Sequence, residues 1–128
     1  MVSSVAIVGA GAIGAWIGDA FDRAGWNVSM LARGATLETL RACGLRVTQG
    51  DESRVTRPRA GSAAELGAHD YVFLSVKAQR LPVIAPQLSP LIGPSTVVII
   101  GTNGIPWWFF HDFGGPLANR SLDRKSVV

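Results

Sequence analysis

The sequence predicts an α/β fold with a doubly wound, mostly parallel sheet. Short apolar runs, typical of buried strands, alternate along the chain with segments whose apolar residues recur at helical spacing. Three glycines follow the first apolar run at once, in a spacing that predicts a tight turn and then a helix. No internal repeat or low-complexity segment interrupts this order. Strands joined through helices pair in parallel, which gives the predicted sheet.

The composition describes one globular domain. The 128 residues are 48% hydrophobic and 16% charged, which excludes a disordered chain. The net charge is +3, and the basic residues are scattered, so no nucleic-acid-binding stripe is expected. The single cysteine, Cys43, excludes an internal disulfide, and His69 and His111 have no companions at metal-ligand spacing. We expect no metal site and small anionic ligands.

Two uncharged stretches could be mistaken for membrane or export segments. The first precedes Asp19, but no lysine or arginine stands before its apolar run, as an export signal requires. The second spans residues 81–110 and is broken by Pro82, Pro86, Pro90, Pro94 and Pro106. The sequence therefore predicts a soluble, cytoplasmic protein without a membrane partner.

The first half of the chain gives the clearer elements. Residues 5–8 form a continuous apolar run typical of a buried strand. A helix is expected over 12–24, with Asp19, Asp22 and Arg23 facing away from its apolar side and Gly25 at its end. A strand over 28–31 and a short helix over 36–43 follow, the latter closed by Gly44.

The second half is less regular. Alternating residues between 45 and 60 indicate weak strands around a polar turn at 50–52. A helical turn over 62–66 and a firm strand over 71–76 come next. The spacing over 82–92 predicts a helix that Pro86 keeps kinked or short. The last clear strand is expected over 96–100.

The turn after the first strand carries the chemistry. It reads Gly9-Ala10-Gly11-Ala12-Ile13-Gly14, a G-x-G-x-x-G pattern between a buried strand and a helix. There the first glycine permits the turn, the second admits a pyrophosphate and the third lets the helix pack closely. The helix N-terminus adds unpaired N–H groups for phosphates. The pattern predicts a Rossmann-type dinucleotide site, with an incidental glycine turn as the alternative.

The end of the second strand indicates which dinucleotide is bound. NAD-binding sites place an acidic residue there, whereas this chain has no Asp or Glu between Arg23 and Glu38. Arg33 can instead hold a 2′-phosphate through charge-assisted, bidentate contacts. NADP(H) is therefore the expected cofactor, unless Arg33 is only a solvated charge.

Two polar residues follow later strands, where ligands bind in parallel sheets. Lys77 comes after the strand predicted over 71–76, and Asn103 after the strand over 96–100. The alternatives are that Lys77 only begins a helix and that Asn103-Gly104 is a common turn pair.

Four stretches together resemble the N-terminal half of the ketopantoate reductases, from about residue 4 to about residue 117: "VAIVGAGAIGAWIG", "LARG", "DYVFLSVKAQ" and "TNGIPWW". The resemblance implies reduction of 2-dehydropantoate to pantoate by NADPH, in coenzyme A synthesis; close relatives reduce other 2-keto acids. It implies a pyrophosphate held by Gly9, Gly11 and Gly14 and a 2′-phosphate held by Arg33. It also places Lys77 in the cleft and Asn103 beside the nicotinamide ribose and the substrate hydroxyl.

The chain also departs from that family. The resemblance implies a second, helical domain with a general-acid lysine and a substrate-binding glutamate, and neither has a counterpart here. We expect an incomplete cofactor domain over 1–117, with about five strands where six are usual, and a polar tail over 118–128. The aromatic run 107–110 is expected to line the cleft or to pack in the core. The alternatives are a non-enzymatic NADP-binding module, a degenerate fragment, or a reductase of another 2-keto acid. The expected macromolecular partners are a second copy in a homo-oligomer or a chain that supplies the missing domain.

Overall fold

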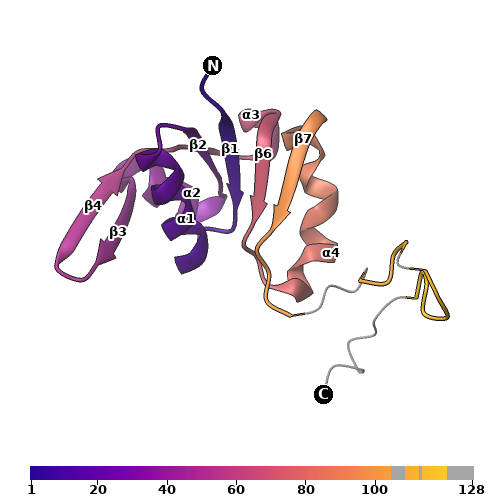
Figure 1. Cartoon of the computed structure of the whole chain (residues 1–128). Helices are drawn as coiled ribbons and strands as arrows, with labels where there is room; N and C mark the ends of the chain where they lie inside the picture. Colours follow the sequence, from indigo (N-terminus) through magenta and orange to yellow (C-terminus); the bar gives the residue numbers. More distant parts are fainter. Residues whose placement is uncertain (105–108, 113, 121–128) are drawn as a thin grey trace.

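A five-stranded parallel sheet forms the centre of the computed structural model, which describes residues 1–104, 109–112 and 114–120 (Figure 1). Its strands lie in the order β5, β2, β1, β6 and β7, and every neighbouring pair is parallel. The chain runs outward from β1 to β2 and β5, then crosses to β6 and β7 on the other side. This order confirms the predicted doubly wound sheet and puts its switch point between β1 and β6.

Residues 1–44 fold as predicted, to within a few residues at each end of an element. They contain the strands β1 (Ser4–Val8) and β2 (Asn27–Leu31) and the helices α1 (Ala12–Arg23) and α2 (Gly34–Cys43). The four apolar residues of β1 are fully buried, as expected for the central strand of a covered sheet. Gly25 follows α1 with a φ of +81°, a conformation that ends a helix and suits glycine.

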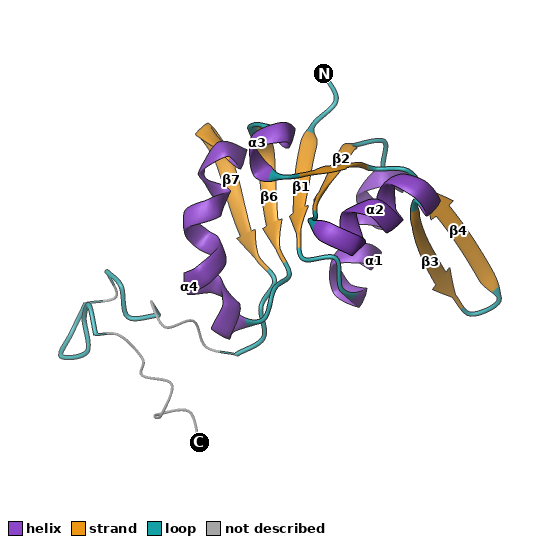
Figure 2. Cartoon of the chain, turned by 180° about the vertical axis from the view of Figure 1, so that it is seen from behind, coloured by secondary structure: helices purple, strands orange, loops and turns teal. Residues whose placement is uncertain are grey.

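The predicted weak strands form β3 (Leu45–Gln49) and β4 (Glu52–Thr56), but they pair only with each other. Figure 2 shows this hairpin standing apart from the main sheet. The edge strand on this side of the main sheet is instead β5 (Arg59–Gly61), which the sequence analysis did not predict. Its three residues are too few for any alternation of apolar and polar side chains to show.

The second half begins with α3 (Ala63–Leu66) and β6 (His69–Leu74), so the strand predicted over 71–76 ends two residues early. One turn of helix, α4 (Leu81–Ile84), lies between two 3₁₀ segments, η1 (Ala78–Arg80) and η2 (Ala85–Leu91). The helix thus gives way at Pro86, as a proline without an N–H donor requires. The strand β7 (Ile92–Ile100) begins earlier than predicted and forms the other edge of the sheet.

Helices cover both faces of the sheet because alternate strand residues point to opposite sides. On one side Ala6, Val8 and Val72 pack with residues of α3, α4 and η2. On the other, Val5, Ile7 and Met30 pack against α1, α2 and β3. The two clusters fix β1 between its neighbours and so place the turn that follows it.

Asp19 corrects the prediction that it faces away from the protein. Its residue surface is only 4% exposed, and its carboxylate accepts hydrogen bonds from Arg23 (2.8 Å) and Arg54 (2.7 Å). Arg54 also donates to Asp22 at 2.6 Å and so ties the hairpin to α1. The helical spacing of α1 predicts that Asp19 is exposed. It carries no information about Arg54, which lies 35 residues away in the sequence and covers Asp19 in the fold.

The Asp19 cluster predicts a loss of stability in acid. Burial raises the pKa of Asp19, but the hydrogen bonds from Arg23 and Arg54 outweigh it and hold the pKa below its ordinary value. The ionised carboxylate therefore stabilises the fold above about pH 4, and this contribution is lost as the pH falls through the lowered folded pKa. We expect Asp19→Asn to cost about 1.5–3 kcal/mol near pH 7.

Thermal unfolding of the wild type and Asp19→Asn between about pH 7 and about pH 3 measures this effect. The gap between the two melting temperatures should narrow as the pH falls below about 4, because the unfolded carboxylate takes up a proton more readily than the folded one. Asp51→Asn, in the exposed hairpin turn, is the matched control. A gap that stays constant over this pH range would contradict the assignment.

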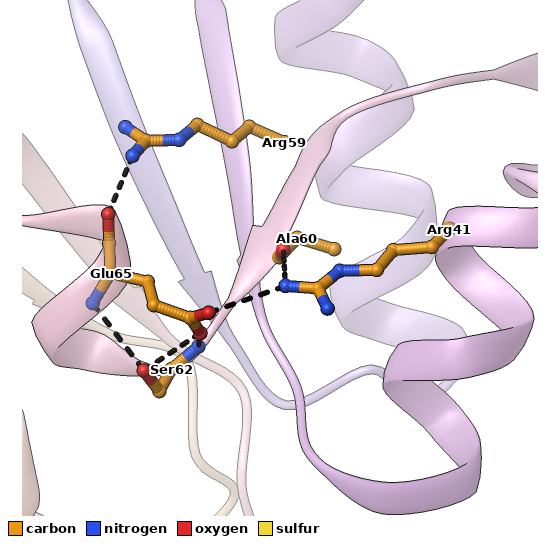
Figure 3. Close-up of polar contacts among 5 residues, drawn as sticks. All are labelled: Arg41, Arg59, Ala60, Ser62 and Glu65. Carbon is orange, nitrogen blue, oxygen red and sulfur yellow. Dashed lines mark hydrogen bonds and ion pairs between the residues drawn. The ribbon is translucent and has the colours of Figure 1, made fainter.

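A polar network joins α2, β5 and α3 (Figure 3). Ser62 caps α3, and the Glu65 carboxylate accepts from the Ser62 N–H at 2.7 Å and from its hydroxyl at 2.8 Å. Arg41 donates to Glu65 and to the Ala60 carbonyl, while Arg59 donates to the Glu65 carbonyl. The Ser62 N–H and hydroxyl, more than Arg41, lower the pKa of Glu65. The network fixes the carboxyl end of β5 beside that of β2.

Candidate functional site

The glycine-rich turn leads from the buried strand β1 directly into α1. Gly9 has a φ of +111°, which side chains disfavour, and Gly11 stands in extended conformation at the N-cap. The first α1 hydrogen bond to the cap runs from the Ala15 N–H to the Gly11 carbonyl at 2.9 Å. No side chain caps the helix, so the N–H groups of its first turn are left for an external acceptor.

Gly14 and Gly11 differ in the space that surrounds them. A Cβ on Gly14 would lie 1.9 Å from the Gly9 carbonyl oxygen, so α1 can approach the turn this closely only with glycine there. A Cβ on Gly11 would meet no atom within 4 Å. Gly11 thus borders open space, as a residue approached by a pyrophosphate must. The glycine turn therefore leaves room for the diphosphate of a dinucleotide.

Arg33 lies where the 2′-phosphate contact was predicted, just beyond β2. It is exposed and forms the N-cap of α2, before Gly34 with a φ of +55°. The preceding Ala32 donates its N–H to the Gly61 carbonyl at 3.1 Å, which ties this segment to β5. Since β2 pairs in parallel with β1, Arg33 and the glycine turn both follow the carboxyl ends of their strands and lie along the same edge of the sheet, the one formed by those ends.

Lys77 and Asn103 also leave the sheet at this edge. Lys77 is exposed and stands three residues after β6, just before η1. Asn103, also exposed, follows β7, and the Gly101 N–H donates to the Leu74 carbonyl at 2.8 Å, holding the two strand ends together. Parallel pairing of β1, β6 and β7 thus brings the segments of both residues to the edge where the glycine turn lies.

Residues 5–106 match the family described as ketopantoate reductase PanE/ApbA. The chain belongs to the ketopantoate reductase family. The match runs from the second residue of β1 to beyond β7 and includes the carboxyl end of every strand.

Individual relatives agree with the family assignment. The chain is 45% identical over 121 residues to a 2-dehydropantoate 2-reductase of Mesorhizobium japonicum, and 33% identical over 99 residues to the uncharacterized oxidoreductase YkpB of Bacillus subtilis. The matches cover 93% and 77% of this chain but 37% and 32% of those proteins. A crystal structure of a candidate ketopantoate reductase from Ralstonia solanacearum superposes with a TM-score of 0.88 at 44% identity. That match covers 95% of this chain and 38% of the other, so the chain spans well under half the length of these relatives.

Ser75 lies beside the glycine turn, and its sequence context had predicted only that it belongs to a strand. It lies just beyond β6, and its hydroxyl reaches the carbonyls of Val8 (3.1 Å) and Gly9 (2.9 Å). A small hydroxyl residue at the end of the strand beside a glycine turn is the only signal for it in the sequence. That signal has meaning once β1 and β6 are known to be neighbours.

The aromatic run 107–110 lies only partly within the described residues. Trp107 and Trp108 lie outside the described residues, while the rings of Phe109 and Phe110 meet edge to face at 5.2 Å. Within the described ranges, no three His, Cys, Asp or Glu side chains gather where they could hold a metal ion. The helices described there are all too short or too polar to cross a bilayer.

Proposed function

We propose that this chain binds NADPH and provides the cofactor-binding part of a reductase that converts 2-dehydropantoate to pantoate. The observation that carries the proposal is the glycine turn at the switch point of a parallel sheet, with open space at Gly11 and a helix start without a side-chain cap. Gly9, Ala10, Gly11, Ala12, Ile13 and Gly14 would hold the pyrophosphate.

Preference for NADPH over NADH rests on Arg33. It stands at the end of the strand next to β1, where its guanidinium can make paired hydrogen bonds to a 2′-phosphate. No carboxylate occurs between Arg23 and Glu38 to repel that phosphate or to bind free ribose hydroxyls. The charge pattern at this strand end therefore favours the phosphorylated cofactor.

NADPH, when bound, supplies the hydride for reduction of a ketone. The Lys77 ammonium would attract the negative charge of cofactor or substrate, and the Asn103 amide would hydrogen-bond the nicotinamide ribose and the substrate hydroxyl. Both residues leave the sheet at the edge where the reacting groups would meet. The proposed role of Lys77 and Asn103 is to bind and orient the cofactor and the substrate.

The substrate part of the proposal rests on the relatives. The Mesorhizobium japonicum protein is a 2-dehydropantoate 2-reductase, and this chain matches 37% of its length. The family resemblance assigns the general-acid lysine to a second, helical domain. We expect this chain by itself to be at least about 10²-fold slower than a reductase with its general acid.

Calorimetric titration of the purified chain with NADPH and with NADH tests the cofactor proposal. We expect NADPH to bind about tenfold more tightly or better, because a charge-assisted contact to the 2′-phosphate contributes about 1.5–3 kcal/mol. Equal affinities would refute the assigned role of Arg33. No binding of either cofactor would refute the proposed function itself.

A further inference from the structure

We infer that Ser75 is a positioning residue that holds the glycine turn in the conformation needed for pyrophosphate binding. The inference rests on the proposed NADPH function and adds a residue outside the glycine pattern. Ser75 is only partly exposed and lies immediately after β6, opposite the end of β1.

Two donors of Ser75 hold the end of β1. Its backbone N–H donates to the Val8 carbonyl at 2.9 Å, which extends the pairing of β1 and β6 by one bond. Its hydroxyl lies 2.9 Å from the Gly9 carbonyl oxygen and 3.1 Å from that of Val8. A hydroxyl has one proton, so these two carbonyls share it. The Gly9 carbonyl is thereby directed inward, toward β6.

The direction of the Gly9 carbonyl decides that of the next N–H. In a planar trans peptide the C=O and the following N–H point in opposite directions, and no described peptide is cis. With the Gly9 carbonyl turned toward Ser75, the Ala10 N–H must point away from β6. Because it points away from β6, that N–H can donate to a phosphate ahead of the N–H groups of α1.

The Ser75 side chain also fits the space that the glycines leave. Its Oγ lies 2.8 Å from the position of a Cβ on Gly9 and 2.7 Å from that of a Cβ on Gly14. The hydroxyl therefore stands where side chains on either glycine would stand. Removing it leaves a gap beneath the turn and leaves the Gly9 carbonyl without its side-chain donor, so the peptide is free to rotate.

Titrations of three Ser75 variants with NADPH and with adenosine 2′-monophosphate test the inference. The monophosphate carries the 2′-phosphate but no pyrophosphate, so it probes the Arg33 end alone. We expect Ser75→Ala and Ser75→Cys to bind NADPH about three- to tenfold more weakly, the loss of one hydrogen bond, with unchanged affinity for the monophosphate. Ser75→Thr, which keeps the hydroxyl, should restore NADPH binding.

The controls separate this inference from the proposed function. Ser95→Ala, at an exposed serine of β7, should bind both ligands as the wild type does. The cysteine variant leaves no gap, because its sulfur is somewhat larger than the oxygen and is only a weak donor, and so it decides the question if the alanine variant does not fold. Unchanged NADPH affinity in a folded Ser75→Ala or Ser75→Cys variant overturns the inference, and so does an equal loss for both ligands. A wild type that binds no NADPH overturns the proposed function as well.

Discussion

Gly14→Ala is expected to abolish measurable NADPH binding and to destabilise the fold by about 3 kcal/mol. The new Cβ would lie 1.9 Å from the Gly9 carbonyl oxygen and 2.7 Å from the Ser75 hydroxyl. A backbone carbonyl cannot swing aside as the tip of a flexible side chain can, so the start of α1 must move away from the turn. That movement separates the N–H groups that the pyrophosphate needs together.

Gly11→Ala is the matched control for this substitution. Its Cβ meets nothing within 4 Å, so the variant should unfold at the wild-type temperature. The added methyl group nevertheless occupies the approach of the pyrophosphate, and NADPH binding should weaken. Thermal melts followed by circular dichroism, together with calorimetric titrations, measure both properties. A Gly14→Ala variant with wild-type stability and affinity would contradict the packing described for the turn.

Arg33→Ala is expected to weaken NADPH binding about 10- to 100-fold and to leave NADH binding unchanged. The change removes a charge-assisted contact worth about 1.5–3 kcal/mol, and only NADPH carries the phosphate that makes it. Since Arg33 is exposed, the substitution should leave the melting temperature unchanged. Titration of both cofactors against the variant measures the effect.

Two further arginine variants sharpen the result. Arg46→Ala removes an exposed arginine from β3 and should affect neither cofactor, which excludes an effect of net charge. Arg33→Lys keeps the charge but loses the planar fork and should recover only part of the NADPH affinity. Equal losses for NADH and NADPH in Arg33→Ala would show that Arg33 supports the fold of the site and does not bind the 2′-phosphate.

Local signals in the sequence were enough for the first strand, the turn after it and the first helix. The apolar run of β1, the glycines after it and the helical spacing of α1 are each encoded by neighbouring residues, and all form as predicted. Pro86 likewise marks in advance where a helix must change, since a proline beyond the first turn of a helix lacks the N–H that the next backbone hydrogen bond needs. These elements follow from the chain's own covalent and hydrophobic pattern.

Features that depend on distant residues were missed or misjudged. The strand β5 is defined by its pairing with β2 and not by its own three residues. Asp19 is buried because an arginine from the hairpin covers it, and the periodicity of α1 contains no information about that contact. Ser75 gains its contacts only when β6 lies beside β1. In each case the sequence did not show which distant residues would lie beside the feature in the fold.

The position of β1 in the middle of the sheet has a consequence for how the protein is made. This strand leaves the ribosome before the other strands of the sheet, yet the Gly9 carbonyl accepts a hydrogen bond from the Ser75 hydroxyl, 66 residues later in the chain. A nascent chain that ends before β6 therefore exposes an apolar strand and an unformed turn. Parallel pairing over such separations is slow, because loop closure precedes the contacts that reward it. A ligand that binds only the completed turn would stabilise the finished sheet and none of its shorter precursors.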